Sequence, residues 1–203
     1  MAIAQVQAPA AFTGSSSTAS GTFSSTGSGN FLIAAVVARN TVSTTSGWTL
    51  ATSYTAPTTK AYLFYQENCS SGVTSFSATL GGSAAWVVML AEYSGVATSG
   101  SIDQTATDNT GGGGSTTGSI TTTTSAQLLI GVIADDDNDG PFGTPTNSFS
   151  LLSEADNGFA EGCLLERIVS STGTYSSSVS SGGGDSGLIA SFKAATGGDV
   201  TIS

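Results

Sequence analysis

The chain has 203 residues, only 9% of them charged, and 14 acidic against four basic side chains give a net charge of −10. The four cations, Arg39, Lys60, Arg167 and Lys193, are scattered, so the basic stripe that nucleic-acid binding needs is missing. The chain has no histidine, which excludes catalytic triads and histidine metal sites. No run of 18 apolar residues predicts a membrane helix.

Residues 1–12 lack the basic and apolar regions of a signal peptide, and we expect an extended arm there. Such an arm docks either on its own domain or on a neighbouring chain. Its spaced apolar side chains are the predicted partner-binding residues: Ile3, Val6, Pro9 and Phe12.

The next segments predict short strands, because apolar runs alternate with turns rich in Ser, Thr and Gly. Residues 30–39 are apolar without a polar break, which favours a central strand covered on both faces. Residues 81–83, Gly-Gly-Ser, are expected to form a turn. The other strands expected in the first half are 17–26, 47–52, 61–67, 73–80 and 84–93.

After a polar joint at 98–117, the pattern of the first half returns. Phe31 matches Leu128, 97 residues further on, and Trp48 matches Phe149 at a distance of 101 residues. Six elements recur in this order, which indicates an internal repeat. We therefore predict an all-β sandwich of jelly-roll type, with repeats 13–97 and 98–198 intertwined in a single domain. Two small sandwiches split near 98–117 are the alternative.

The loop at 135–140, Asp-Asp-Asp-Asn-Asp-Gly, reproduces the first half of a calcium-binding loop. Asp135, Asp137 and Asp139 are the predicted Ca²⁺ ligands. Thr146 stands where such a loop needs a bidentate glutamate, so an acidic loop without a metal is the competing interpretation.

Few residues in the sequence are of the types that catalysis needs, and we expect that the chain is not an enzyme. Glycoside hydrolysis needs two carboxylates across a cleft, and Glu92 is the most prominent candidate, although a solvated strand end is the better explanation of this residue. Cys69 and Cys163 occupy non-equivalent places in the two repeats, which favours two free, partly buried thiols over a single disulfide between the halves. Trp48 and Trp86 lie in apolar alternation, which favours the core over a sugar-stacking platform.

The segment 82–96, Gly-Ser-Ala-Ala-Trp-Val-Val-Met-Leu-Ala-Glu-Tyr-Ser-Gly-Val, and the later Ile102-Asp103-Gln104-Thr105 resemble a repeated β-sandwich module of bacteriophage virion proteins. The likeness covers residues 17–193. It implies a structural protein that decorates or cements a capsid, located in the virion and made in the host cytoplasm.

The partners that this resemblance implies are the major capsid protein or tail proteins, together with further copies of the chain. The alternative function is a tail, fibre or surface adhesin module that binds host glycans through exposed aromatic side chains such as Tyr65.

Overall fold

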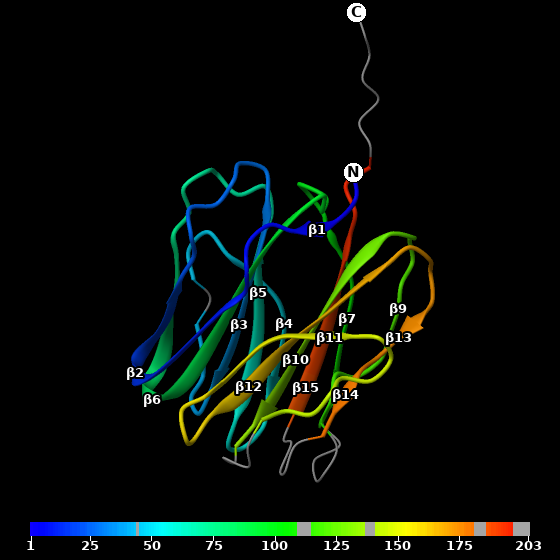
Figure 1. The fold of residues 1–203 in the computed structure, drawn as a ribbon. Coiled ribbons are helices and arrows are strands. Elements are labelled where there is room, and N and C mark those ends of the chain that lie inside the picture. The colour runs from blue at the N-terminus through cyan, green and yellow to red at the C-terminus, as the bar shows by residue number, and fades with distance from the viewer. Residues whose placement is uncertain (44, 109–114, 137–140, 181–185, 197–203) are drawn as a thin grey trace, which may run out of the picture.

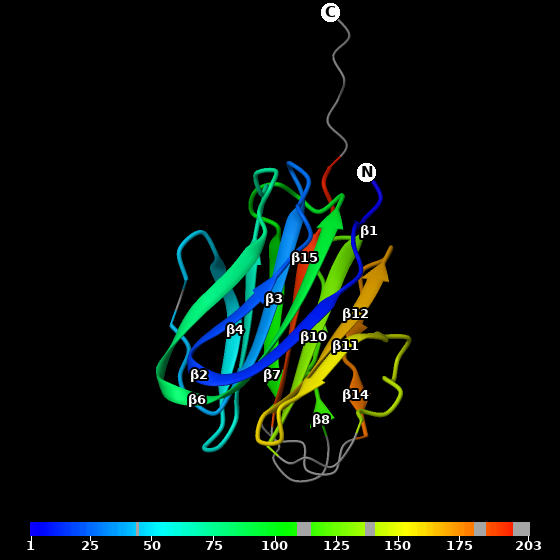
Figure 2. The same cartoon turned by 60° about the vertical axis from the view of Figure 1, so that its left-hand side comes forward.

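The structure is a computed structural model, and it describes all residues except 44, 109–114, 137–140, 181–185 and 197–203. All regular secondary structure in the described part is β-strand. The strands form two large antiparallel sheets that face each other, as Figures 1 and 2 show from two sides. The predicted all-β sandwich is therefore confirmed.

The first sheet is built from residues 4–94. Its strand order is β1-β6-β3-β5-β4, and β2 pairs with β6 as well. The bounds are β1 Ala4–Gln5, β2 Ala10–Thr22, β3 Phe31–Ala38, β4 Thr49–Thr55, β5 Lys60–Gln66 and β6 Ser75–Ser94.

The second sheet is built from residues 102–193, and its strand order is β11-β12-β10-β15-β7. The bounds are β7 Ile102–Asp108, β10 Gln127–Asp135, β11 Ser150–Asp156, β12 Glu161–Val169 and β15 Ser186–Lys193. Two short ribbons lie outside it, one formed by β8 Ser115–Thr116 with β14 Ser178–Val179, the other by β9 Ile120–Thr121 with β13 Thr174–Tyr175.

The strand order corrects the expected intertwining of the two halves. In a jelly roll consecutive strands pass between the sheets, whereas here each half of the chain forms one sheet. The order β4-β5-β3-β6 in the first sheet has its counterpart in β11-β12-β10-β15 in the second. Both also carry a β-bulge at the same place, after Leu50 and after Leu151. The internal sequence repeat itself stays a prediction, with which this matched pairing is consistent.

The central core lies between the sheets, and β3 and β10 contribute alternate residues to it. Phe31, Ile33, Ala35 and Val37 of β3 belong to one apolar cluster with Leu128, Ile130, Val132 and Ala134 of β10. The residues between them point outward into two further clusters, one on the outside of each sheet. Every residue of both strands is buried, as predicted for strands covered on both faces. Each large side chain buried here contributes about 1.5–3 kcal/mol.

The outer cover of the first sheet is one long ribbon of β2 and β6. The expected turn at Gly81–Ser83 is wrong, because β6 runs through these residues without a break. Gly81 lies close against Thr41, and an added Cβ would meet the Thr41 hydroxyl at 2.5 Å. The two glycines thus let a continuous strand pass close to a neighbouring loop as it crosses from the cover into the sheet.

Side-chain contacts join the sheets at the end of β3. Arg39 donates hydrogen bonds to the Asp136 carbonyl at 2.6 Å and to the Phe159 carbonyl, and its guanidinium lies 5.8 Å from the centre of the Phe159 ring. Nearby, Asn157 donates to the Gly14 carbonyl at 2.7 Å. These contacts fix the loop between β11 and β12 against the first sheet.

A carboxylate holds the start of β7 to the segment before β10. Asp103 accepts hydrogen bonds from the Thr123 amide at 2.8 Å, from the Thr123 hydroxyl and from the Gln127 side chain at 2.6 Å. Partial burial raises the pKa of Asp103, but the hydrogen bonds from Gln127 and Thr123, helped by Lys193, leave it below its usual value.

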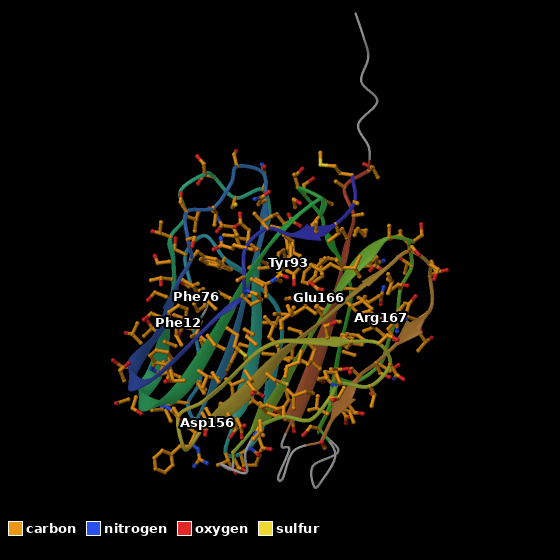
Figure 3. All side chains as sticks on the ribbon, in the orientation of Figure 1. Phe12, Phe76, Tyr93, Asp156, Glu166 and Arg167 are labelled. Atoms are coloured by element: carbon orange, nitrogen blue, oxygen red, sulfur yellow. The ribbon has the colours of Figure 1, made fainter. Side chains whose placement is uncertain are left out.

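One polar pair lies between the sheets. Tyr93 of β6 is fully buried, and its hydroxyl lies near the Glu166 carboxylate of β12 (Figure 3). Within the described part of the chain, neither the Tyr93 hydroxyl nor Oε2 of Glu166 has a hydrogen-bond partner. Burial, followed by the charge of Glu166, raises the pKa of Tyr93.

Candidate interaction surface

The N-terminal arm docks on its own sheet, which is one of the two arrangements expected from the sequence. Ala4 and Gln5 of β1 pair with Ser94 and Tyr93 of β6. The four predicted partner-binding residues lie along this path in different surroundings. Ile3 packs against the central core, Phe12 packs against the outer cluster of the first sheet, Pro9 is half-buried, and Val6 is 47% exposed.

A buried carboxylate locks the arm in place. Glu92, near the end of β6, is only 1% exposed, so its interpretation as a solvated strand end is wrong. Its Oε1 accepts the Gly27 amide at 3.0 Å and the Asn30 side chain at 2.6 Å, while Oε2 accepts the Gln7 side chain. In turn, Oε1 of the Gln7 side chain accepts a hydrogen bond from the Ser24 amide at 3.0 Å. Glu92 thus joins the arm to the loop before β3.

Other carboxylates are also engaged with the chain. Glu67 accepts the Ser101 amide at 2.6 Å and the Gly100 amide at 3.2 Å, which ties the first sheet to the joint between the halves. Glu154, Asp156 and Glu161 line one hollow of about 300 Å³ beside β11. There Glu154 accepts the Phe142 amide, and Asp156 accepts the Gly158 amide. Both side chains therefore hold loop backbone in place.

The acidic loop is described only at its start. Asp135 ends β10, is fully buried, and lies opposite Glu161 in the register with β12. Asp137 and Asp139 lie outside the described residues. In the described part, no three His, Cys, Asp or Glu residues gather as a metal site would require. The Ca²⁺ site stays a prediction.

The two cysteines are free, as predicted, and both are buried. They belong to different outer clusters, Cys69 to that of the first sheet and Cys163 to that of the second. Burial raises the pKa of both thiols. The thiol is the less reactive form of cysteine, so neither residue is set up as a nucleophile.

The two tryptophans form core rather than a sugar-stacking platform, also as predicted. Trp48 and Trp86 are buried, and the Trp86 ring nitrogen donates to the Ser16 hydroxyl at 3.1 Å. Tyr65 belongs to the central core and is 8% exposed, so it is no surface contact for a glycan.

The edge formed by β2 is a surface feature that could not be predicted from the sequence pattern. This strand has 13 residues without a charged side chain, and in the described chain it pairs only with β6. Its side chains alternate, so that Thr13, Ser15 and Ser17 are exposed on one side. Natural edge strands are usually blunted by charged residues, proline or a cover. An uncharged edge can accept a strand from another chain.

The fold and these contacts define the class of protein: a two-sheet β-sandwich whose N-terminal arm is built into one sheet. Comparison with known protein families, with curated proteins and with solved structures finds no match for this chain. Among the described residues, no helix is long and apolar enough to cross a membrane.

Proposed function

We propose that this chain is a non-enzymatic structural protein of a bacteriophage virion, and that it decorates or cements the capsid by binding the lattice of the major capsid protein. The proposal starts from the resemblance of residues 82–96 to virion sandwich modules. The observation that carries it is the long uncharged edge of β2, which can pair with a neighbouring chain through backbone groups other than the Gly14 carbonyl, since Asn157 already donates to that carbonyl.

The composition of the surface supports the same role. With 9% charged residues, the surface has few long flexible side chains to immobilise on contact with a neighbour. Exposed Thr13, Ser15 and Ser17 present short side chains along the β2 edge. Binding along this edge therefore loses little side-chain entropy, which favours close packing between capsid subunits or between copies of the chain.

The contacts of the arm determine how this proposal can be tested. Deleting residues 1–12 would remove the Ile3 packing, the Gln7 hydrogen bonds and the first part of β2, and would damage the fold itself. A single charged residue on the edge is the better change. Ser15→Lys places a cation on the exposed side of β2, and Thr49→Lys places the same charge on exposed Thr49 of β4, the opposite edge strand.

The experiment measures co-sedimentation with particles of the phage that encodes the chain, prepared without this protein. We expect the unchanged chain and Thr49→Lys to sediment with the particles, and Ser15→Lys to lose about tenfold in affinity. Absence of the protein from native particles by mass spectrometry would refute the virion role. Equal binding by Ser15→Lys would instead refute only the role of the β2 edge.

A further inference from the structure

Two adjoining hollows lie on the outside of the second sheet, among the short ribbons that cover it. Their volumes are about 330 and 360 Å³, and Asn147 and Ser176 line both. Each is in the size range of small-molecule sites, and they meet where the Asn147 side chain donates to the Ser176 carbonyl at 3.0 Å. The two hollows together are called the groove. Its remaining lining is mostly hydroxyl-bearing or charged: Asp108, Thr116, Ser119, Thr146, Ser148, Arg167, Thr174, Tyr175, Ser177 and Ser178, with Gly118.

The groove exists because the two sheets are covered differently. The cover of the first sheet is one continuous ribbon, β2 with β6. On the second sheet, β8 with β14 and β9 with β13 form two separate ribbons. Between them, the Thr117 amide donates to the Ser177 carbonyl at 3.0 Å, and the Ser177 amide donates to the Thr117 hydroxyl at 3.0 Å. The floor of the groove is thus held in shape without a ligand.

The rim of the groove contains backbone strain. In the turn before β11, Phe149 donates to the Thr146 carbonyl, and the two central residues, Asn147 and Ser148, have φ of 55° and 58°. Asparagine tolerates this left-handed conformation, but serine does so only at a cost. In the matching turn before β4, Gly47 stands at the position that corresponds to Ser148, with φ of 81°. The second sheet therefore keeps a serine hydroxyl at the rim where glycine would relax the turn.

A fixed cation stands at the other side of the groove. The guanidinium of Arg167 in β12 lies 4.9 Å from the centre of the Tyr175 ring, and Nη1 donates to the Asn147 carbonyl at 2.8 Å. The Tyr175 hydroxyl in turn donates to the Ser171 carbonyl. Figure 3 labels Arg167 on the side of the molecule where Figure 1, in the same orientation, labels β9 and β13. A guanidinium has five N–H donors, so Arg167 has donors left for a ligand.

We propose that this groove binds a neutral oligosaccharide. Each sugar hydroxyl both donates and accepts hydrogen bonds. The lining offers hydroxyl and carboxylate oxygens as acceptors and the guanidinium of Arg167 as a donor, whereas the hydroxyl protons of Tyr175 and Ser177 are donated within the chain. An anionic polymer fits poorly, because the groove holds one cation and the chain has a net charge of −10. The site is separate from the β2 edge, and the proposal does not depend on a role in virions.

The test is calorimetric titration of the full chain with four neutral trisaccharides: maltotriose, cellotriose, laminaritriose and tri-N-acetylchitotriose. Because Tyr175, the aromatic residue among the lining, is buried, it offers little ring surface for stacking, and we expect at least one sugar to bind with a dissociation constant of about 1 mM. Arg167→Gln removes the fixed donor and should weaken binding about tenfold. The matched control is Gln66→Ala, which changes the corresponding place at the end of β5 in the first sheet.

Ser148→Gly separates a binding role from a structural one. It relaxes the turn, so the melting temperature should rise by about 2–4 °C, while loss of the hydroxyl should weaken trisaccharide binding about fivefold. Failure of all four sugars to bind at about 10 mM would overturn the proposal. So would binding that Arg167→Gln and Ser148→Gly leave unchanged, or that Gln66→Ala weakens equally.

Discussion

Replacing the buried carboxylate at the base of the N-terminal arm is the sharpest test of how this fold is held together. Glu92→Gln keeps the size of the side chain but exchanges one acceptor oxygen for an NH₂ donor. In the structure Glu92 accepts three hydrogen bonds, from Gln7, Gly27 and Asn30. At least one of them must then be lost or rearranged, because a donor would face a donor. The two others lose the assistance of the negative charge.

The size of the expected stability change follows from the charge of the Glu92 carboxylate. Hydrogen bonds to a charged group contribute about 1.5–3 kcal/mol each, against about 0.5–1.5 kcal/mol for neutral ones. Removing the charge also removes the desolvation penalty of a carboxylate that is only 1% exposed, which offsets part of the loss. We therefore expect Glu92→Gln to lower the free energy of unfolding by about 2–4 kcal/mol. For a chain of this length the melting temperature should fall by about 5–15 °C.

The assay is urea unfolding at neutral pH, followed by tryptophan fluorescence, with Glu67→Gln as the matched control. Glu67 also accepts two backbone amides, but it is half-buried, so water can replace a lost bond and the expected change is below about 1 kcal/mol. Gln7→Ala should selectively speed hydrogen exchange at the Val6 amide, which donates to the Glu92 carbonyl. A Glu92→Gln protein within about 0.5 kcal/mol of the unchanged chain would refute the reasoning.

Three further predictions concern buried or coupled groups. Tyr93→Phe removes a buried hydroxyl without a hydrogen-bond partner, so thermal unfolding should show equal or up to about 1 kcal/mol greater stability; a clear loss would contradict this. Because the pKa of Asp103 is depressed in the fold, its carboxylate stabilises the chain above about pH 3.9 and ceases to do so as the pH falls through the folded-state pKa. The destabilisation caused by Asp103→Asn at pH 7 should therefore shrink in acid. Cys69 and Cys163 should react with a thiol reagent only on unfolding, and labelling of the native chain would count against their burial.

The features that the sequence predicted well are those determined by local pattern. The strands β3 and β10 are unbroken apolar runs, and only a strand covered on both faces buries every residue of such a run. Trp48 and Trp86 stand at alternating apolar places, and both belong to the outer cluster of the first sheet. Periodicity alone is enough for such positions.

The features that the sequence missed depend on partners far along the chain. Glu92 ends an apolar run as a solvated residue would, and its donors Gln7 and Asn30 lie 85 and 62 residues away. Gly81 is a turn former by composition, but it keeps β6 close to Thr41, which no local pattern indicates. The expected intertwining of the two halves was wrong for a related reason. The spacing of apolar runs indicates where strands lie, but it does not indicate which sheet each strand joins.

The groove was missed because it arises from a difference between two similar halves rather than from a motif. Phe76 and Tyr175 both pack in the outer cluster of their sheet. In the first sheet Phe76 lies in a continuous ribbon among aromatic rings, whereas Tyr175 lies in a two-residue strand under Arg167. One cover is a continuous ribbon, and the other is interrupted. The two matched sheets share one core and differ in their covers. The groove beside Ser148 lies where the covers differ, so we expect a function beyond stability there.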